Sequence, residues 1–389
     1  MAYIGIDVAK YKHSAAVIGE QGERLLRDFE FANDNEGFET LLQRLAQVGA
    51  TAKRSTVCLE ATGHYGRNLI EFLERNRYAV CEVNPLLTSN WRKAMSVRNV
   101  KNDAVDAEAL ALWLYAGNPA RRHRRNMKKR SQDLRSLSRY RSSLSHIMGD
   151  CKRKAVALLD ILFPEFSGFF SNGFCKTSMV VLKRWPGSRP IARASTDALA
   201  NMMFEASGGK FVRADALRLK RLAEQSVGQY SRPLQFELRQ LLAQIEFTKK
   251  QISALDDQLE RIVGDSPLMT IPGIGTVCAA GILGELGDVS RFASASNIVA
   301  YAGCDPTVFE SGEFEGTRAH MSKRGSPYLR WYLWVAADRA RRFDPALAEY
   351  YQKKRDEGKC HKVAVSAVVC KLCAIIFAML RDNKPYMPA

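Results

Sequence analysis

The first 116 residues alternate between short β-type segments and helical segments in an order that few folds allow. Three apolar β-type segments are followed by a helix, a strand, a helix, a strand and two helices. The first three strands predict an antiparallel meander, and each later strand is expected to join the sheet through a helical crossover. The expected strands are YIGIDVAK, HSAAVIGE, ERLLRDFEFAN, STVCLEA and YAVCEVNP; the expected helices are NEGFETLLQRLAQV with Asn35 as N-cap, GHYGRNLIEFLERN, LLTSNWRKAM and residues 103–116.

Four carboxylates stand at special places in this pattern. Asp7 ends the apolar segment YIGID and Glu60 ends TVCLE, whereas Asp103 and Asp106 open the last helix three residues apart, on one face. Acids in apolar surroundings are costly unless they are paired or bind a metal. The order of strands and helices resembles the ribonuclease H-like arrangement in outline. Four acids placed in that order predict an Mg²⁺ site, because hard cations take carboxylate oxygens. Taken singly, Asp103 is an N-cap and Asp106 a first-turn acid stabilised by the helix dipole.

The positive charge is concentrated outside this region. The chain carries a net charge of +17. Residues 1–116 hold 14 Lys and Arg against 15 Asp and Glu, so residues 117–389 carry the excess of +18. Such an excess favours a polyanionic partner, either nucleic acid or an anionic membrane surface.

A basic linker is predicted over residues 117–130, GNPARRHRRNMKKR. Its cations have no acid among them, which favours contact with phosphates over a merely solvated charge run. The candidate nucleic-acid-binding residues are Arg121, Arg122, Arg124, Arg125, Lys128, Lys129 and Arg130.

The region 131–263 is expected to be helical, with coiled-coil character at both ends. Apolar residues recur near heptad spacing over 131–160 and again over 234–263. Two such helices pair antiparallel within one chain or between two chains. The first repeat consists of Leu134, Leu137, Leu144, Ile147 or Met148, Cys151, Ala155 and Leu158.

The last region, 264–389, is expected to be mainly α-helical. TIPGIGTVCAAGILGELGD resembles one helix–hairpin–helix unit with Gly273 and Gly275 in the turn, which either offers backbone N–H groups to a phosphate or forms a packing corner. Residues 305–327 predict a hairpin or an irregular loop, and three helices follow.

The apolar segment 362–380 is expected to be a buried helix rather than a membrane span, since Lys371 lies in its middle. It contains the pair Cys370 and Cys373, for which core packing is favoured over zinc, although Cys360 and His361 lie nearby. MAYIGIDVAK lacks the features of a signal peptide, and the nine cysteines are expected to be reduced in a cytoplasm.

These residues resemble a family of bacterial insertion-sequence transposases. The order GID, LEATGHYG, KNDAVDA is similar to the RuvC-like DEDD domain of that family, and PGIGTVCAAGILGELGD … RF … YAG … SG … SKRG is similar to its second, transposase domain. The resemblance covers about 1–116 and 264–345. It implies a ribonuclease H-like, RuvC-like first domain and a transposase domain over 264–389.

The resemblance implies a recombinase guided by a structured noncoding RNA, called bridge RNA, that pairs with donor and target DNA. Asp7, Glu60, Asp103 and Asp106 are then expected to bind Mg²⁺, with Mn²⁺ as an alternative. Ser311 is expected to be the nucleophile, in a dimer that assembles to a tetramer and shares its sites between protomers. On its own chemistry Ser311 is a loop serine, because FESGEFEG offers it no adjacent base. Nearby candidates for phosphate contact are Arg318, Lys323, Arg324 and Arg330.

Two other functions remain open. One is a RuvC-like metal-dependent structure-specific nuclease, in which water is the nucleophile and Ser311 is inert. The other is a non-enzymatic RNA- and DNA-binding protein with structural acids. The second domain argues against the nuclease, and the four intact acids argue against the binding protein.

Overall fold

A computed structural model describes residues 1–60, 63–83, 85, 87–89, 91, 103–117, 129–306, 310–311, 314–315 and 320–388. The chain divides into two compact units, Met1–Asn126 and Met127–Ala389. The division falls inside the predicted basic linker.

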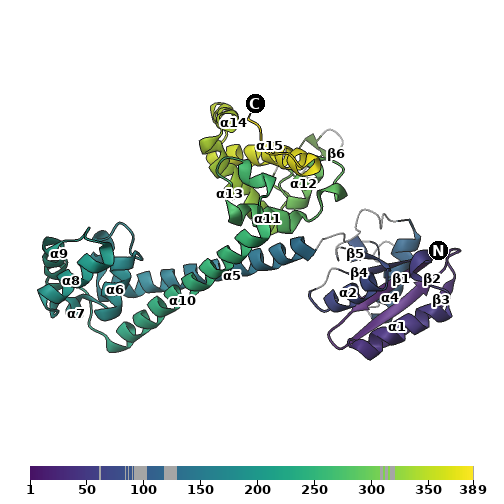
Figure 1. The fold of residues 1–389 in the computed structure, drawn as a ribbon, viewed down its shortest axis with the longest axis horizontal. Coiled ribbons are helices and arrows are strands. Elements are labelled where there is room, and N and C mark those ends of the chain that lie inside the picture. Colours follow the sequence, from purple (N-terminus) through teal and green to yellow (C-terminus); the bar gives the residue numbers. More distant parts are fainter. Residues whose placement is uncertain are drawn as a thin grey trace. The chain divides into compact units, whose positions relative to one another are not determined.

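The first unit contains a mixed five-stranded sheet with the strand order β3-β2-β1-β4-β5 (Figure 1). The first three strands in the chain pair antiparallel, as the predicted meander requires, and β1, β4 and β5 pair parallel. This sheet, followed by many helices, fits the predicted ribonuclease H-like domain. The strands are β1 (Ala2–Val8), β2 (Lys12–Ile18), β3 (Arg24–Ala32), β4 (Ser55–Glu60) and β5 (Ala79–Val83).

Helices cover both faces of this sheet. The apolar residues of α1 (Asn35–Gln47) and α2 (Arg67–Arg75) form one core with β1 and β4, and α4 (Asp103–Tyr115) forms the other core with Cys58 and Cys81. The predicted N-cap of α1 is wrong by one residue. Asp34, in extended backbone, accepts the N–H of Gly37 at 2.8 Å, and Asn35 is already helical. The predicted helix LLTSNWRKAM lies largely outside the described residues.

The second unit is built on two long helices, α5 (Lys129–Leu162) and α10 (Arg232–Val263), which run antiparallel within the chain. Arg130 at the start of α5 donates to the Ile262 carbonyl near the end of α10, and Arg141, further along α5, pairs with Asp256, earlier in α10, so the two helices run in opposite directions. Of the two alternatives in the heptad pattern, Met148 packs in the core, and Ile147 is exposed. We call this helix pair the arm.

A separate core lies where α5 ends and α10 begins. It contains four phenylalanines from 163–170 and apolar residues of four short helices. The sequence pattern had not predicted this group. The elements are η3 (Pro164–Gly168), α6 (Lys176–Arg184), α7 (Ser188–Ala192), α8 (Thr196–Ser207) and α9 (Arg213–Glu224).

The remaining helices pack around α11, which lies against α5 near its start. Close approach is possible because α11 presents glycines: a Cβ on Gly284 would come within 2.5 Å of the Arg135 nitrogen, and one on Gly281 within 2.3 Å of the Tyr332 ring. The elements are η4 (Pro267–Thr270), α11 (Thr276–Leu286), η5 (Val289–Arg291), α12 (Ala295–Ala302), β6 (Glu310–Ser311), β7 (Phe314–Glu315), α13 (Pro327–Phe343), α14 (Pro345–Asp356) and α15 (His361–Asp382).

Helix α15 is the one helix in the described part of the chain that is long and apolar enough to cross a membrane. Its apolar residues, Cys373 among them, pack in the core with α12 and α13, whereas Cys370 is exposed. The predicted buried helix is therefore observed. Gly273, in the turn before α11, packs against Arg339 of α13, and Gly275 meets nothing within 4 Å.

Candidate active site

The parallel strands β1 and β4 bring two of the predicted acids to neighbouring positions. Ile6 is the register partner of Leu59, and the next residue of each strand is Asp7 and Glu60. Side chains at matching positions of parallel strands point to the same face. Asp7 and Glu60 therefore occupy the face opposite Ile6 and Leu59, which is the face that α4 covers.

Helix α4 begins at the same end of the sheet. Tyr115 at its C-terminus stacks edge-on against Tyr3 near the start of β1, so α4 runs antiparallel to β1. Helix α4 lies directly against β1 at Gly5, where a Cβ would come within 2.0 Å of the Ala107 carbonyl oxygen. Asp106, the residue before Ala107, is half-buried. Asp103 is the first residue of α4, and its side chain lies outside the described part of the chain.

The Glu60 carboxylate has a neighbour that sequence reasoning missed. The hydroxyl of Thr88, a buried side chain, donates to Glu60 and also lies 3.0 Å from the Pro85 carbonyl oxygen. A fixed donor of this kind orients a carboxylate and limits its rotamers. The contact spans 28 residues of sequence, and no local pattern pointed to it.

The thiol closest in sequence to these acids is buried beside a second thiol. Cys58 lies two residues before Glu60 and pairs in register with Cys81. A hydrogen bond with Cys81 and then burial raise the pKa of the Cys58 thiol, and both cysteines belong to the core under α4. The predicted donors at this edge of the sheet are carboxylate oxygens, which suit a hard cation. Among the described side chains, which exclude that of Asp103, no group of three His, Cys, Asp or Glu is arranged to hold a metal ion.

Ser311 lies in a short hairpin in the second unit. It is the register partner of Phe314, and Glu310 pairs with Glu315. The side chain of Ser311 lies outside the described part of the chain, as does Arg318. The hairpin is one of the two alternatives that the sequence predicted for this segment.

The segments 301–306 and 321–326, which flank this hairpin in the sequence and which we call its base, are tied to each other. The Ser322 hydroxyl donates to the Asp305 carboxylate at 2.6 Å, and Pro306 forms an isolated bridge with Met321. In the same two segments, Gly303 and Gly325 pack so closely that a Cβ on Gly303 would come within 2.6 Å of the Gly325 nitrogen. Backbone hydrogen bonds between 301–305 and 322–326 complete this support.

The predicted phosphate-binding cations divide into three groups. Lys323 and Arg324 are exposed at the hairpin base, and Lys129 is exposed at the start of α5. Arg330 donates to the Ala302 carbonyl at 2.8 Å, and Arg130 donates to two carbonyls at the C-terminus of α10. These two guanidinium groups therefore have structural partners. The remaining candidates lie outside the described residues: Arg121, Arg122, Arg124, Arg125 and Lys128.

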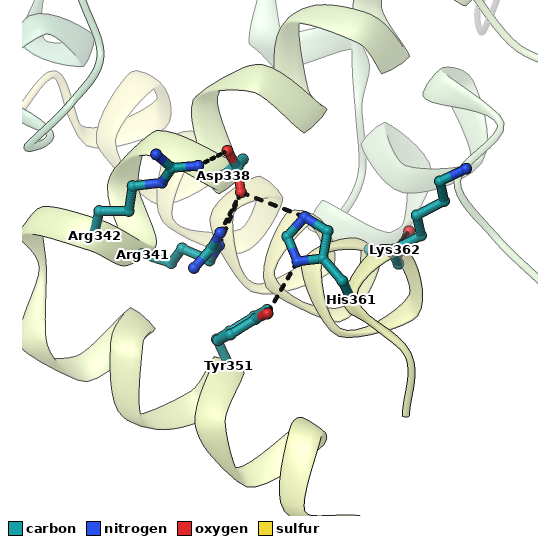
Figure 2. A network of polar contacts seen from close by, with 7 residues as sticks. Asp338, Arg341, Arg342, Tyr351, His361 and Lys362 are labelled. Atoms are coloured by element: carbon teal, nitrogen blue, oxygen red, sulfur yellow. Dashed lines mark hydrogen bonds and ion pairs between the residues drawn. The ribbon is translucent and has the colours of Figure 1, made fainter. Parts of the chain in front are cut away.

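Another polar cluster, also missed from sequence, joins α13, α14 and α15 (Figure 2). Asp338 accepts hydrogen bonds from Arg341 at 2.6 Å and Arg342 at 2.7 Å. Nε2 of His361 lies 3.9 Å from the Asp338 carboxylate, and Nδ1 of the same ring lies 2.9 Å from the Tyr351 hydroxyl. Burial raises the pKa of Asp338, but the two arginines outweigh it and hold that pKa below its usual value. The cluster ties the three helices together.

Two models of known protein families match separate regions of the chain. Residues 4–164 match a family model described as a transposase, the DEDD domain of IS110 elements, and residues 265–352 match the transposase IS116/IS110/IS902 family.

Several curated proteins are similar to the chain. A 44.8 kDa protein of insertion element IS116 from Streptomyces clavuligerus is 24% identical over 100% of this chain and 96% of its own length. The pilin gene-inverting protein of Moraxella bovis is 24% identical over 99% and 97%. A 43.6 kDa protein of IS110 from Streptomyces coelicolor is 31% identical over 38% of each chain. The chain therefore carries the two domains of IS110/IS116-family transposases.

Proposed function

We propose that this protein is a DNA transposase or recombinase that cuts and rejoins DNA strands with metal-binding carboxylates and a serine nucleophile. The strongest support is the coincidence of two transposase domains with an acid-bearing sheet edge, where Asp7 and Glu60 occupy neighbouring positions facing α4. The relatives named for insertion elements and for pilin gene inversion support DNA as the substrate.

Asp7, Glu60, Asp103 and Asp106 are the proposed ligands of Mg²⁺, with Mn²⁺ as an alternative. When bound, the cation stabilises the charge that develops on the phosphate oxygens during strand cleavage. Asp7 and Glu60 would hold the cation from the ends of β1 and β4, and Asp103 and Asp106 would hold it from the first turn of α4. The Thr88 hydroxyl keeps Glu60 oriented.

Ser311 is the proposed nucleophile. Its hydroxyl oxygen attacks phosphorus and forms a phosphoserine ester, its proton leaves to a base, and the displaced DNA oxygen takes up a proton as a free hydroxyl end. The Asp305–Ser322 hydrogen bond ties together the two segments that flank the hairpin in the sequence. Lys323 and Arg324, exposed at that base, are placed to contact phosphates.

The guide RNA and the assembly are also part of the proposal. The excess of +18 in residues 117–389 suits a protein that holds both DNA and a structured RNA. A dimer that assembles to a tetramer would supply acids and serine from different protomers. The competing function is a RuvC-like nuclease, in which the same carboxylates activate water.

Covalent trapping distinguishes these two reactions. A labelled suicide DNA substrate, whose cleaved strand diffuses away, should leave wild-type protein attached to a DNA end on a denaturing gel. Ser311→Ala should abolish the adduct and the cleavage, whereas Ser253→Ala, an exposed serine of α10, should change neither. Full cleavage by Ser311→Ala without an adduct would establish the water mechanism instead.

A further inference from the structure

Two arginines contact one tyrosine where α10 begins, and a third follows the first of them at the end of α7. Arg189 lies in α7, Arg193 follows it, and Arg232 is the first residue of α10. Between them is Tyr230, and all four side chains are exposed. We call these residues the arm-end cluster.

The cluster has a defined geometry. The guanidinium carbon of Arg189 lies 5.3 Å from the centre of the Tyr230 ring, and Arg232 Nε donates to the Tyr230 hydroxyl at 3.2 Å. The hydrogen bond from Arg232 lowers the pKa of Tyr230, and the charges of Arg193 and Arg189 add to this effect. Arg193 stands four residues after Arg189, at the C-terminal end of α7, and so lies on the same face of that helix.

These guanidinium groups lack anionic partners. In the described part of the chain, none of Arg189, Arg193 and Arg232 forms an ion pair with a carboxylate, whereas Arg213 pairs with Asp197 and Lys183 pairs with Glu246 in the same group of helices. Like charges held together repel one another, and a bound anion removes that repulsion. Arginine forks match phosphate oxygens in particular.

The cluster is also fixed in place by the backbone. The Gln229 N–H donates to the Ile161 carbonyl at 2.8 Å, and the Ser188 hydroxyl donates to the Leu162 carbonyl at 3.0 Å. A Cβ on Gly228 would come within 2.4 Å of the Leu162 carbonyl oxygen. The segments on both sides of Tyr230 are thus packed on the end of α5, and binding an anion requires little reordering.

We propose that Arg189, Arg193, Arg232 and Tyr230 form a binding site for the phosphodiester backbone of nucleic acid. The proposal deepens the proposed function, since a recombinase must hold its nucleic acids. The site lies 27 residues along α5 from Arg135, where α11 packs, which is about 40 Å at 1.5 Å per residue. It therefore binds nucleic acid well away from α11.

Salt-dependent binding tests this site. The variant is the full-length chain with Arg189→Gln, Arg193→Gln and Arg232→Gln. Its binding to a labelled 30-base-pair DNA duplex and to a labelled 30-nucleotide RNA is measured by fluorescence anisotropy. Probes of about 30 units are long enough to span the distance of about 40 Å between the cluster and α11. At least one probe should bind about tenfold or more weakly. Its logarithmic salt slope should fall by about 2 to 3, because each phosphate contact releases counterions.

The matched control removes three exposed cations of neighbouring segments outside the cluster: Arg184→Gln in α6, Lys210→Gln between α8 and α9, and Arg221→Gln in α9. The variant Arg189→Lys, Arg193→Lys and Arg232→Lys keeps the charge and should keep most of the salt slope, which separates lost contacts from misfolding. If the glutamine variant binds only one of the two probes more weakly, the site is assigned to that nucleic acid, DNA or RNA. Because the readout is binding, it stands apart from the cleavage test of Ser311. If the glutamine variant and its control behave alike with both probes, the proposal is overturned.

Discussion

Arg139 of α5 and Glu285 of α11 form a two-pronged ion pair, with Nε–Oε1 at 2.6 Å and Nη2–Oε2 at 3.0 Å. The Glu285 side chain is 1% exposed. The Ser326 hydroxyl, at the N-cap of α13, donates to the same carboxylate at 2.9 Å. Burial lowers the pKa of Arg139, but the bonds and charge of Glu285 outweigh it and raise that pKa. Glu285 of α11 thus connects α5 of the arm with the start of α13, the helix that follows the hairpin of Ser311.

Replacing this acid should destabilise the second unit. Glu285→Gln keeps the shape but leaves Arg139 without its counter-charge. Breaking a buried pair costs about 3–5 kcal/mol, and partial exposure of Arg139 reduces this to about 2 kcal/mol. Urea unfolding of the full chain measures the change. Glu237→Gln, an exposed position of α10, should stay within about 0.5 kcal/mol of wild type. Equal stability of both variants would contradict a structural role for the pair.

The contact between Gly5 and α4 should matter for the proposed chemistry. In Gly5→Ala the new Cβ meets the Ala107 carbonyl oxygen, so α4 must move away from β1 and carry Asp106 with it. We expect a stability loss of about 1–3 kcal/mol and a loss of strand cleavage of about 100-fold. In Gly66→Ala the Cβ lies at an ordinary 3.4 Å from Val8, and both properties should be nearly unchanged. Wild-type cleavage by Gly5→Ala would mean that this packing does not position the acids.

Local patterns predicted the elements of the first unit but not the contacts between them. Apolar β-type runs located the strands, and the acids that end them indicated Asp7 and Glu60. The Asn35 error arose because Asp34 and Asn35 are both good caps, and only the backbone distinguishes them. Thr88 was missed because its contact with Glu60 depends on the fold.

Longer-range features left even weaker signals. Arg139 and Glu285 are 146 residues apart, although Glu285 within the apolar run GILGEL is a residue that burial would penalise. The short helices α6 to α9 pack through clustered phenylalanines without a long amphipathic repeat. The arginines around Tyr230 are separated in the sequence and meet only where α7 and α10 pack on the end of α5.

Acid should destabilise the first unit through His13. Its ring is buried beside Phe31 and Phe38, and Nδ1 accepts the Ala9 N–H at 3.3 Å. Burial lowers the pKa of His13, although a hydrogen bond with Asn33 opposes this. The unfolded chain therefore binds a proton more readily than the folded one. The contribution of the neutral His13 ring to the free energy of unfolding is fully present above about pH 6.5, and it is lost as the pH falls below that value.

Denaturant unfolding at pH 7.5 and 5.5 measures this loss. His13→Phe, which cannot titrate, should lose less stability than wild type over this interval. His146→Gln, an exposed position on α5, should retain the wild-type dependence. A His13→Phe protein with the wild-type pH dependence would exclude His13 as its source.

Mixing two inactive variants should restore strand cleavage if protomers share sites. Asp106→Asn removes a proposed metal ligand in the first unit, and Ser311→Ala removes the proposed nucleophile in the second. In a mixed dimer, one site combines the intact acids of one protomer with the intact serine of the other. Random pairing makes about half of the dimers mixed, so roughly a quarter of wild-type cleavage should return. Mixing Asp106→Asn with Asp7→Asn should restore none, because in either composite site one proposed metal ligand is still missing. Recovery in that control as well would point to residual activity of the single variants, and no recovery in the first mixture would place acids and serine of one protomer in the same site.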